Sequence, residues 1–162
     1  MVQSGVRMLT GAAAAGALLV ASTIAPGHGD EKVEQAIEAR MGFMQAVTWE
    51  AGPLFGMARG DMAYDAEAAM DYANALNALV QYDAGRLFIE GSSRSEVPGE
   101  TRSLMAIWEK PDDFARAYSD FQAAAAGVAA VAGDGQEALA AAVTALGKSC
   151  GTCHKPFRAE AF

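Results

Sequence analysis

The pentapeptide at positions 150–154, Cys-Gly-Thr-Cys-His, restricts the structure of this chain more than any other stretch. Residues three and four apart on an α-helix share a face, so Cys150, Cys153 and His154 project to one side of a helix. The same side is apolar in the preceding turns, with helical spacing, at Leu139, Val143 and Leu146. The sequence therefore predicts a helix whose core-facing side ends in two thiols and an imidazole.

The spacing Cys-x-x-Cys-His is the attachment signature of c-type haem. Both thiols can bond the vinyl groups of one porphyrin, and the imidazole is then an axial ligand of the iron. A thioredoxin-type pair lies near a βαβ pattern, and a structural zinc site needs about four Cys or His ligands, whereas the chain has two of each. We predict one haem c held by Cys150 and Cys153, with His154 on the iron. A haem-free thiol–disulfide protein is the less favoured alternative.

Four segments repeat apolar residues at helical spacing, and none alternates convincingly as a β-strand does. The first starts near 30–31 and meets Gly-Pro at 52–53, which bends or ends a helix, although apolar residues beyond could extend it. The second starts at the capping residue Asp65, the third at Pro111, and the fourth follows a turn at 133–135. Short loops make neighbouring helices antiparallel. The predicted fold is all-α, an antiparallel four-helix bundle enclosing the haem.

The apolar stripes give the expected core. In the first helix the stripe is Val33, Ile37, Met41, Met44, Val47 or Thr48, and Ala51. In the second and third helices it is Met70, Ala73, Leu76 or Asn77, Val80, and then Phe114, Tyr118, Phe121, Ala125 and Val128. Trp49 is expected to pack, residues 87–89 to lie under the haem edge or in the core, and the polar stretch 90–102 to form a surface loop.

The N-terminal segment has the composition of a Sec signal peptide. Arg7 precedes an uncharged, alanine-rich run from Met8 to Ile24, and small, helix-breaking residues follow at 25–29. Such a run is only weakly hydrophobic, which favours cleavage within 21–29 over an uncleaved membrane anchor. We therefore expect residues 1–29 to be removed, residues 30–162 to form one domain, and the protein to be periplasmic without stable membrane insertion.

The charge balance excludes some partners. The formal net charge is −8, and loss of Arg7 makes the mature chain more acidic. Such a surface repels nucleic acid and anionic lipid and suits basic protein partners. Lys148 and Lys155 flank the haem motif and are interpreted as solvated. No Ser/His/Asp arrangement, phosphate loop or paired-carboxylate site is recognisable, so we do not expect an enzyme.

A four-helix chain with Cys-x-x-Cys-His near its C-terminus, followed by an aromatic residue and an arginine, resembles class II cytochrome c. This is the cytochrome c′ family together with its low-spin relatives. The resemblance covers about residues 31–162 and rests on the motif 150–154 with Phe157 and Arg158, and on Arg40 with Met44. It implies a haem inside the bundle, faced by His154 on one side and by Met44 on the other.

The resemblance also implies roles beside the haem. Arg158 matches an arginine next to the proximal face, and Phe157 the aromatic residue before it. Arg40 is expected to be a propionate partner or a solvated arginine. Pro156 disfavours helical geometry at Lys155 and so weakens the match at Phe157 and Arg158.

Three functions follow as expectations. Relatives in which a methionine coordinates the iron are low-spin electron carriers, and Met44 as sixth ligand makes periplasmic one-electron transfer our principal prediction. Relatives with a bulky non-coordinating residue there keep a five-coordinate iron and bind nitric oxide or carbon monoxide, which is the alternative. The haem-free thiol–disulfide protein is third. Redox partners are expected but not identified, and the resemblance allows a homodimer.

Overall fold

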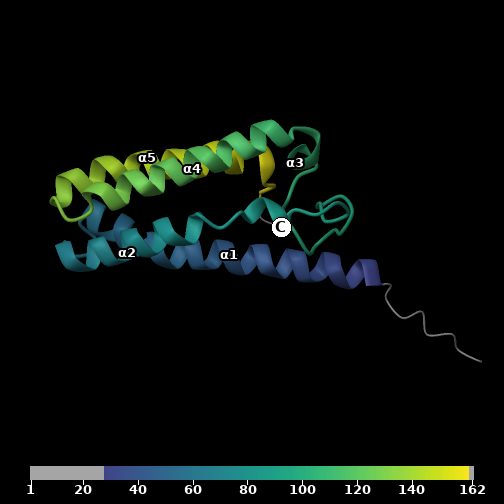
Figure 1. Ribbon diagram of the computed structural model, residues 1–162, viewed down its shortest axis with the longest axis horizontal. Coiled ribbons are helices and arrows are strands. Elements are labelled where there is room, and N and C mark those ends of the chain that lie inside the picture. Colours follow the sequence, from purple (N-terminus) through teal and green to yellow (C-terminus); the bar gives the residue numbers. More distant parts are fainter. Residues whose placement is uncertain (1–27, 161–162) are drawn as a thin grey trace, which may run out of the picture.

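The computed structural model describes residues 28–160, and the regular secondary structure within that range is helical. The long helices are α1 (His28–Arg59), α2 (Ala66–Val80), α4 (Pro111–Val131) and α5 (Gln136–Phe157). Between α2 and α4 lie the 3-10 helix η1 (Ala84–Leu87) and the single turn α3 (Ala106–Glu109). Figure 1 shows α1 and α2 side by side in one layer and α4 and α5 in the other. The predicted four-helix bundle is confirmed.

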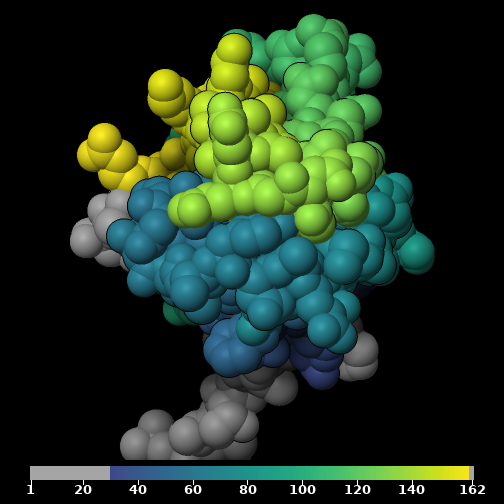
Figure 2. All heavy atoms as spheres, turned by 90° about the vertical axis from the view of Figure 1, so that its left-hand side faces the viewer, coloured from purple at the N-terminus to yellow at the C-terminus, as the bar shows by residue number. Residues whose placement is uncertain are grey.

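The core lies between the two layers and follows the predicted stripes of the last two long helices. Buried residues of α4 and α5 include Phe121, Ala125, Val128, Leu139, Val143 and Leu146. Full burial of a Leu or Phe side chain stabilises a fold by about 1.5–3 kcal/mol. These heptad-spaced side chains therefore hold α4 and α5 as antiparallel neighbours. Figure 2 shows the segment that joins them, in yellow-green, above the end of α1 and the start of α2.

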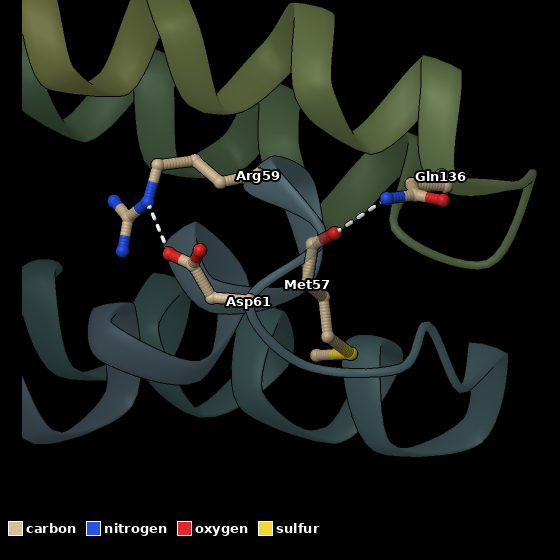
Figure 3. Close-up of polar contacts among 4 residues, drawn as sticks. All are labelled: Met57, Arg59, Asp61 and Gln136. Atoms are coloured by element: carbon tan, nitrogen blue, oxygen red, sulfur yellow. Dashed lines mark hydrogen bonds and ion pairs between the residues drawn. The ribbon is translucent and has the colours of Figure 1, made fainter.

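Helix α1 continues across Pro53 to Arg59, which selects the longer of the two alternatives. Pro53 donates no backbone hydrogen bond, a cost of about 3 kcal/mol inside a helix. Beyond it, Leu54 and Met57 are 0% and 2% exposed, so their burial offsets that cost. The side-chain amide of Gln136 donates to the carbonyl oxygen of Met57 at 2.9 Å, which ties the end of α1 to the start of α5 (Figure 3).

The predicted stripes of α1 and α2 are wrong at Met41 and Met70, and the packing role expected for Trp49 is wrong. These side chains are 51%, 42% and 75% exposed. On α2 the stripe starts at the buried Ala69 and not at its neighbour Met70. On α1 the seam passes through Arg40, which is buried next to Met41. The sequence pattern favours Met41 over Arg40 as the core residue because an arginine is rarely buried without partners.

The ends of the helices follow the local signals in the sequence. The Asp65 carboxylate accepts a hydrogen bond from the backbone N–H of Ala68 at 2.8 Å and caps α2, as predicted. Helix α4 starts at Pro111. Helix α1 starts at His28, slightly before the predicted residue. The predicted signal peptide lies almost wholly outside the described residues, and no helix among those described has both the length and the apolarity to cross a bilayer.

Candidate haem site

The motif 150–154 lies within the last turns of α5, as predicted. Cys150, Cys153 and His154 are each partly buried. Both cysteines are free thiols, the form that reacts with the vinyl groups of a porphyrin. The preceding turns of the helix bury Leu139, Val143 and Leu146, so Cys150, Cys153 and His154 continue the core-facing side of α5.

Two apolar clusters meet at the motif. The main cluster fills the bundle and includes Phe43, Val47, Leu76, Phe121 and Leu146, with Cys150 packed against it. The end cluster consists of Ile107, Ala117 and Phe157, with Phe88, Trp108, Phe114 and Cys153 packed against it. The two thiols thus lie three residues apart at the junction of two apolar regions. A large, flat, apolar porphyrin fits residues in this arrangement, with the thiols as its attachment points.

The electrostatics of α5 favour neutral groups at the motif. Burial raises the pKa of the Cys150 and Cys153 thiols, and Arg158 partly opposes this effect. Burial, followed by the charges of Arg158 and Arg102, lowers the pKa of His154. The imidazole is therefore neutral at neutral pH and keeps a lone pair for a metal.

Helix α5 continues through Pro156 and ends at Phe157. The Phe157 side chain is 5% exposed, and its ring lies 5.3 Å from that of Phe114 in an edge-to-face arrangement. Arg158 has extended backbone geometry, is exposed, and donates its N–H to the His154 carbonyl at 3.0 Å. The structure thus keeps Phe157 in the wall beside Cys153 and places Arg158 just past the helix. Their contact with the haem stays a prediction.

Met44 lies on α1, half-buried, and packs against the main cluster that also receives Cys150. The structure therefore brings Met44 and the motif helix to one apolar cluster. Coordination of the iron by the Met44 sulfur stays a prediction.

Arg40 is not solvated, because its side chain is 4% exposed. It donates hydrogen bonds to the Leu87 carbonyl, to Ser92 and to Thr101. Its guanidinium also lies 5.1 Å from the centre of the Phe88 ring. Burial lowers the pKa of Arg40 to about 10, so it remains charged at neutral pH. The bonds shown hold the loop after η1, and contact with a propionate stays a prediction.

The segment 90–102 is not simply a surface loop, which corrects that prediction. Ser92 and Ser93 are 0% exposed and Thr101 is 5% exposed. Serine and threonine near glycine and proline normally indicate solvent exposure. Here the buried guanidinium of Arg40 donates hydrogen bonds to Ser92 and Thr101, so these residues can be buried. The signal that could have identified these residues is an arginine on an apolar helical seam. Phe88, in the stretch 87–89 that was expected under the haem edge or in the core, packs against the end cluster, as does Trp108, for which the sequence predicted no role at the site.

Comparison with known proteins agrees with this geometry. The family model for cytochrome c′ matches residues 35–158. A cytochrome c-554 from Cereibacter sphaeroides is 43% identical over 78% of this chain and 95% of its own length. A cytochrome c′ from the same species is 42% identical, over 78% of this chain and 85% of that protein. The solved structure of cytochrome c′ from Rhodobacter sphaeroides superposes with a TM-score of 0.77 at 41% identity, covering 80% of this chain and 98% of that one.

These matches span the bundle and the motif, and the free thiols and neutral imidazole on α5 fit the cofactor of the family. The chain therefore belongs to the cytochrome c′ family of class II cytochromes c, and it binds one haem c covalently.

Proposed function

We propose that this chain is an exported monohaem cytochrome that binds a diatomic gas, such as carbon monoxide or nitric oxide, on the side of the haem facing α1. The observation that carries the proposal is the packing of Met44 against the apolar main cluster. An apolar surface beside a metal favours small neutral ligands, and the polarity and steric access of that pocket decide between gas binding and electron transfer.

The alternative at this site is a bond between the Met44 sulfur and the iron. Fixing a methionine side chain costs roughly 1.5–2 kcal/mol of rotamer entropy. Met44 packs against the apolar main cluster, and a flexible thioether side chain can fill such a position as a core residue. The match to the cytochrome c′ family model also supports the gas-binding function.

One-electron transfer is the second candidate. It is favoured by the position of Met44, which packs on the same cluster as Cys150 and so lies on the side of the bundle that the motif helix faces. A thioether opposite a histidine raises the potential of haem iron and favours electron transfer. In this case the partners are redox proteins, and the acidic surface suits basic ones. In either case we propose a role in binding or electron exchange rather than enzymatic turnover.

The test is the visible spectrum of the reduced holoprotein with and without carbon monoxide, for the wild type, Met44→Ala and Met41→Ala. Met41 is the matched control, because it is a methionine on the same helix with a 51% exposed side chain. We expect the wild type and Met41→Ala to bind carbon monoxide alike and Met44→Ala to bind it more tightly. If the wild type and Met41→Ala are low-spin and ignore carbon monoxide while Met44→Ala binds it, electron transfer replaces gas binding.

Export and self-association complete the proposal. Removal of residues 1–29 before or during haem attachment would release the bundle into the periplasm, and mass spectrometry of the purified protein would give the cleavage bond. A homodimer is checked by sedimentation equilibrium. A single species at the monomer mass across micromolar concentrations would contradict the dimer.

A further inference from the structure

Four polar side chains are buried together at the end of the bundle that carries the haem motif. They are Arg40, Ser92, Thr101 and Ser103, here called the buried polar cluster. Figure 1 shows their setting, with the loop after α2 lying beside α1 and the C-terminal end of α5 descending to the same place. The cluster therefore lies where three parts of the chain meet.

Arg40 joins α1 to the loop. Its Nη1 donates to Ser92 Oγ at 2.8 Å and to the Leu87 carbonyl at 3.3 Å. Its Nη2 donates to the Ser92 carbonyl at 2.6 Å and to Thr101 Oγ1 at 2.8 Å. Arg40 lies one helical turn before Met44 on a shared face. These bonds therefore hold in place the part of α1 that carries Met44.

Thr101 is the central member of the cluster. Its Oγ1 accepts from Arg40 Nη2 at 2.8 Å and from the backbone N–H of Ser103 at 3.1 Å, and it donates to Ser103 Oγ at 3.2 Å. A hydroxyl has one donor and two acceptor sites, so this one is fully used. Because Thr101 is only 5% exposed, water does not readily replace these partners.

Ser103 continues the connection to the end of α5. It pairs with Arg158 in an antiparallel bridge, and on either side Leu104 donates its N–H to the Phe157 carbonyl at 3.0 Å and Ala159 donates to the Arg102 carbonyl at 2.8 Å. The Arg158 N–H in turn donates to the His154 carbonyl at 3.0 Å. This pairing fixes the backbone that directly follows His154.

We propose that Thr101 is a positioning residue that sets the separation between α1 at Met44 and the end of α5 at His154. It acts through Arg40 on one side and through Ser103 on the other. The gas-affinity readout rests on the proposed function, whereas the spectroscopic readout does not. Without the hydroxyl, α1 is held less firmly and Met44 moves away more easily. An external ligand then meets less opposition, whether Met44 bonds the iron or only packs over it.

The test uses the holoprotein with Thr101→Val, which keeps the side-chain shape, and Thr101→Ser, which restores the hydroxyl. We expect Thr101→Val to lower the dissociation constant for carbon monoxide by about tenfold, the effect of one hydrogen bond to a charged group. We also expect it to change the spin-state bands of the ferric spectrum. Thr101→Ser should return both to near wild-type values.

Tyr64→Phe is the matched control for lost stability. The Tyr64 hydroxyl donates to the Ala132 carbonyl at 2.9 Å and accepts from the Gly135 N–H at 3.0 Å, beside the turn between α4 and α5. Its loss should lower Tm to a similar extent and leave the carbon monoxide affinity and the ferric spectrum unchanged. If Thr101→Val cannot be purified with its haem, Ser103→Ala is used instead, because it removes one of the three hydrogen-bond partners of Thr101. It should shift the carbon monoxide affinity and the ferric spectrum in the same direction as expected for Thr101→Val, but to a smaller extent.

A Thr101→Val protein, or failing that Ser103→Ala, with a lower Tm but a wild-type ferric spectrum would overturn the positioning role. A change of equal size in Tyr64→Phe would overturn it too, because it would then reflect stability alone. If wild-type protein binds no carbon monoxide, the gas-binding function fails. The spin-state bands of the variants still decide on Thr101 in that case.

Discussion

At the turn end of the bundle, where α4 turns into α5, polar side chains bond to nearby backbone groups at the surface of an apolar core. At the haem end, by contrast, charged and hydroxyl-bearing side chains are themselves buried. At the turn end, Tyr64 and Gln136 bond carbonyl and N–H groups of the turns, and Leu139 is fully buried between the layers. At the haem end, Arg40 and Thr101 are buried beside the junction of two apolar clusters. The turn end thus keeps its polar groups at the edge of the core, while the haem end buries polar groups beside the helix that carries the motif.

The largest effect should come from replacing Cys150 and Cys153 together by Ala. Covalent attachment is then lost, so no haem is fixed at the junction between the two clusters. Cavity-forming substitutions cost about 2–5 kcal/mol each, and we expect the fold to lose several kcal/mol of stability. Hydrogen exchange should show the loss of protection concentrated in residues 87–104 and the end of α5. Equal loss at the turn between α4 and α5 would contradict the difference between the two ends.

The next effect compares two fully buried leucines of α5. Leu139 and Leu146 are each 0% exposed, and Leu→Ala at either should cost about 2–5 kcal/mol. Leu146 lies one turn before Cys150, so only Leu146→Ala should also shift the haem spectrum. Denaturant unfolding and visible absorption measure the two quantities. A haem shift in Leu139→Ala as large as that in Leu146→Ala would remove the distinction.

Apart from Met70, which lies beside Gly133 and is exposed, the turn end was predicted from local signals, whereas the haem end depends on contacts between distant residues. The helical seam of Leu139, Val143 and Leu146 and the cap at Asp65 are local signals, and the structure agrees with them. At the haem end, Met41 was assigned to the core in place of Arg40, because burial of a guanidinium depends on acceptors far along the chain, at Ser92 and Thr101. Such partners have no local periodicity.

The candidate site shows the same division. The motif at 150–154 and its helix could be read directly, since its residues lie within one turn of each other. The surroundings of Met44 and the aromatic wall near Cys153 come from three or more helices, so only the fold brings them together. Pro156 predicted non-helical geometry at Lys155, but α5 stays helical to Phe157, whose ring packs against that of Phe114.

A smaller effect is expected at the cap of α2. Asp65→Ala removes the carboxylate that accepts the Ala68 N–H at 2.8 Å and should cost about 1 kcal/mol. The ferric haem spectrum should not change, because the cap lies at the turn end. Asp65→Asn, which retains an accepting oxygen, is the control and should stay within a few tenths of a kcal/mol of wild type. A shifted spectrum in Asp65→Ala would show that the two ends are coupled.

The smallest effect concerns the ion pair between Arg59 and Asp61, whose side chains are 61% and 63% exposed. Figure 3 shows the pair at the end of α1, with the guanidinium directed away from the Met57–Gln136 contact. Exposed pairs of this kind contribute about 0–1 kcal/mol, so Arg59→Ala should leave the unfolding midpoint nearly unchanged. A loss above about 2 kcal/mol would indicate that this end also depends on charge.

The most direct test of the central claim is the mass of one tryptic peptide from the purified protein. Trypsin cleaves after Lys148 and Arg158 but not between Lys155 and Pro156, so a single peptide, Ser149–Arg158, contains the motif. The account predicts that this peptide carries one haem through Cys150 and Cys153 and absorbs in the visible range. Recovery of the peptide at its bare mass, or with its two cysteines joined in a disulfide, would contradict it.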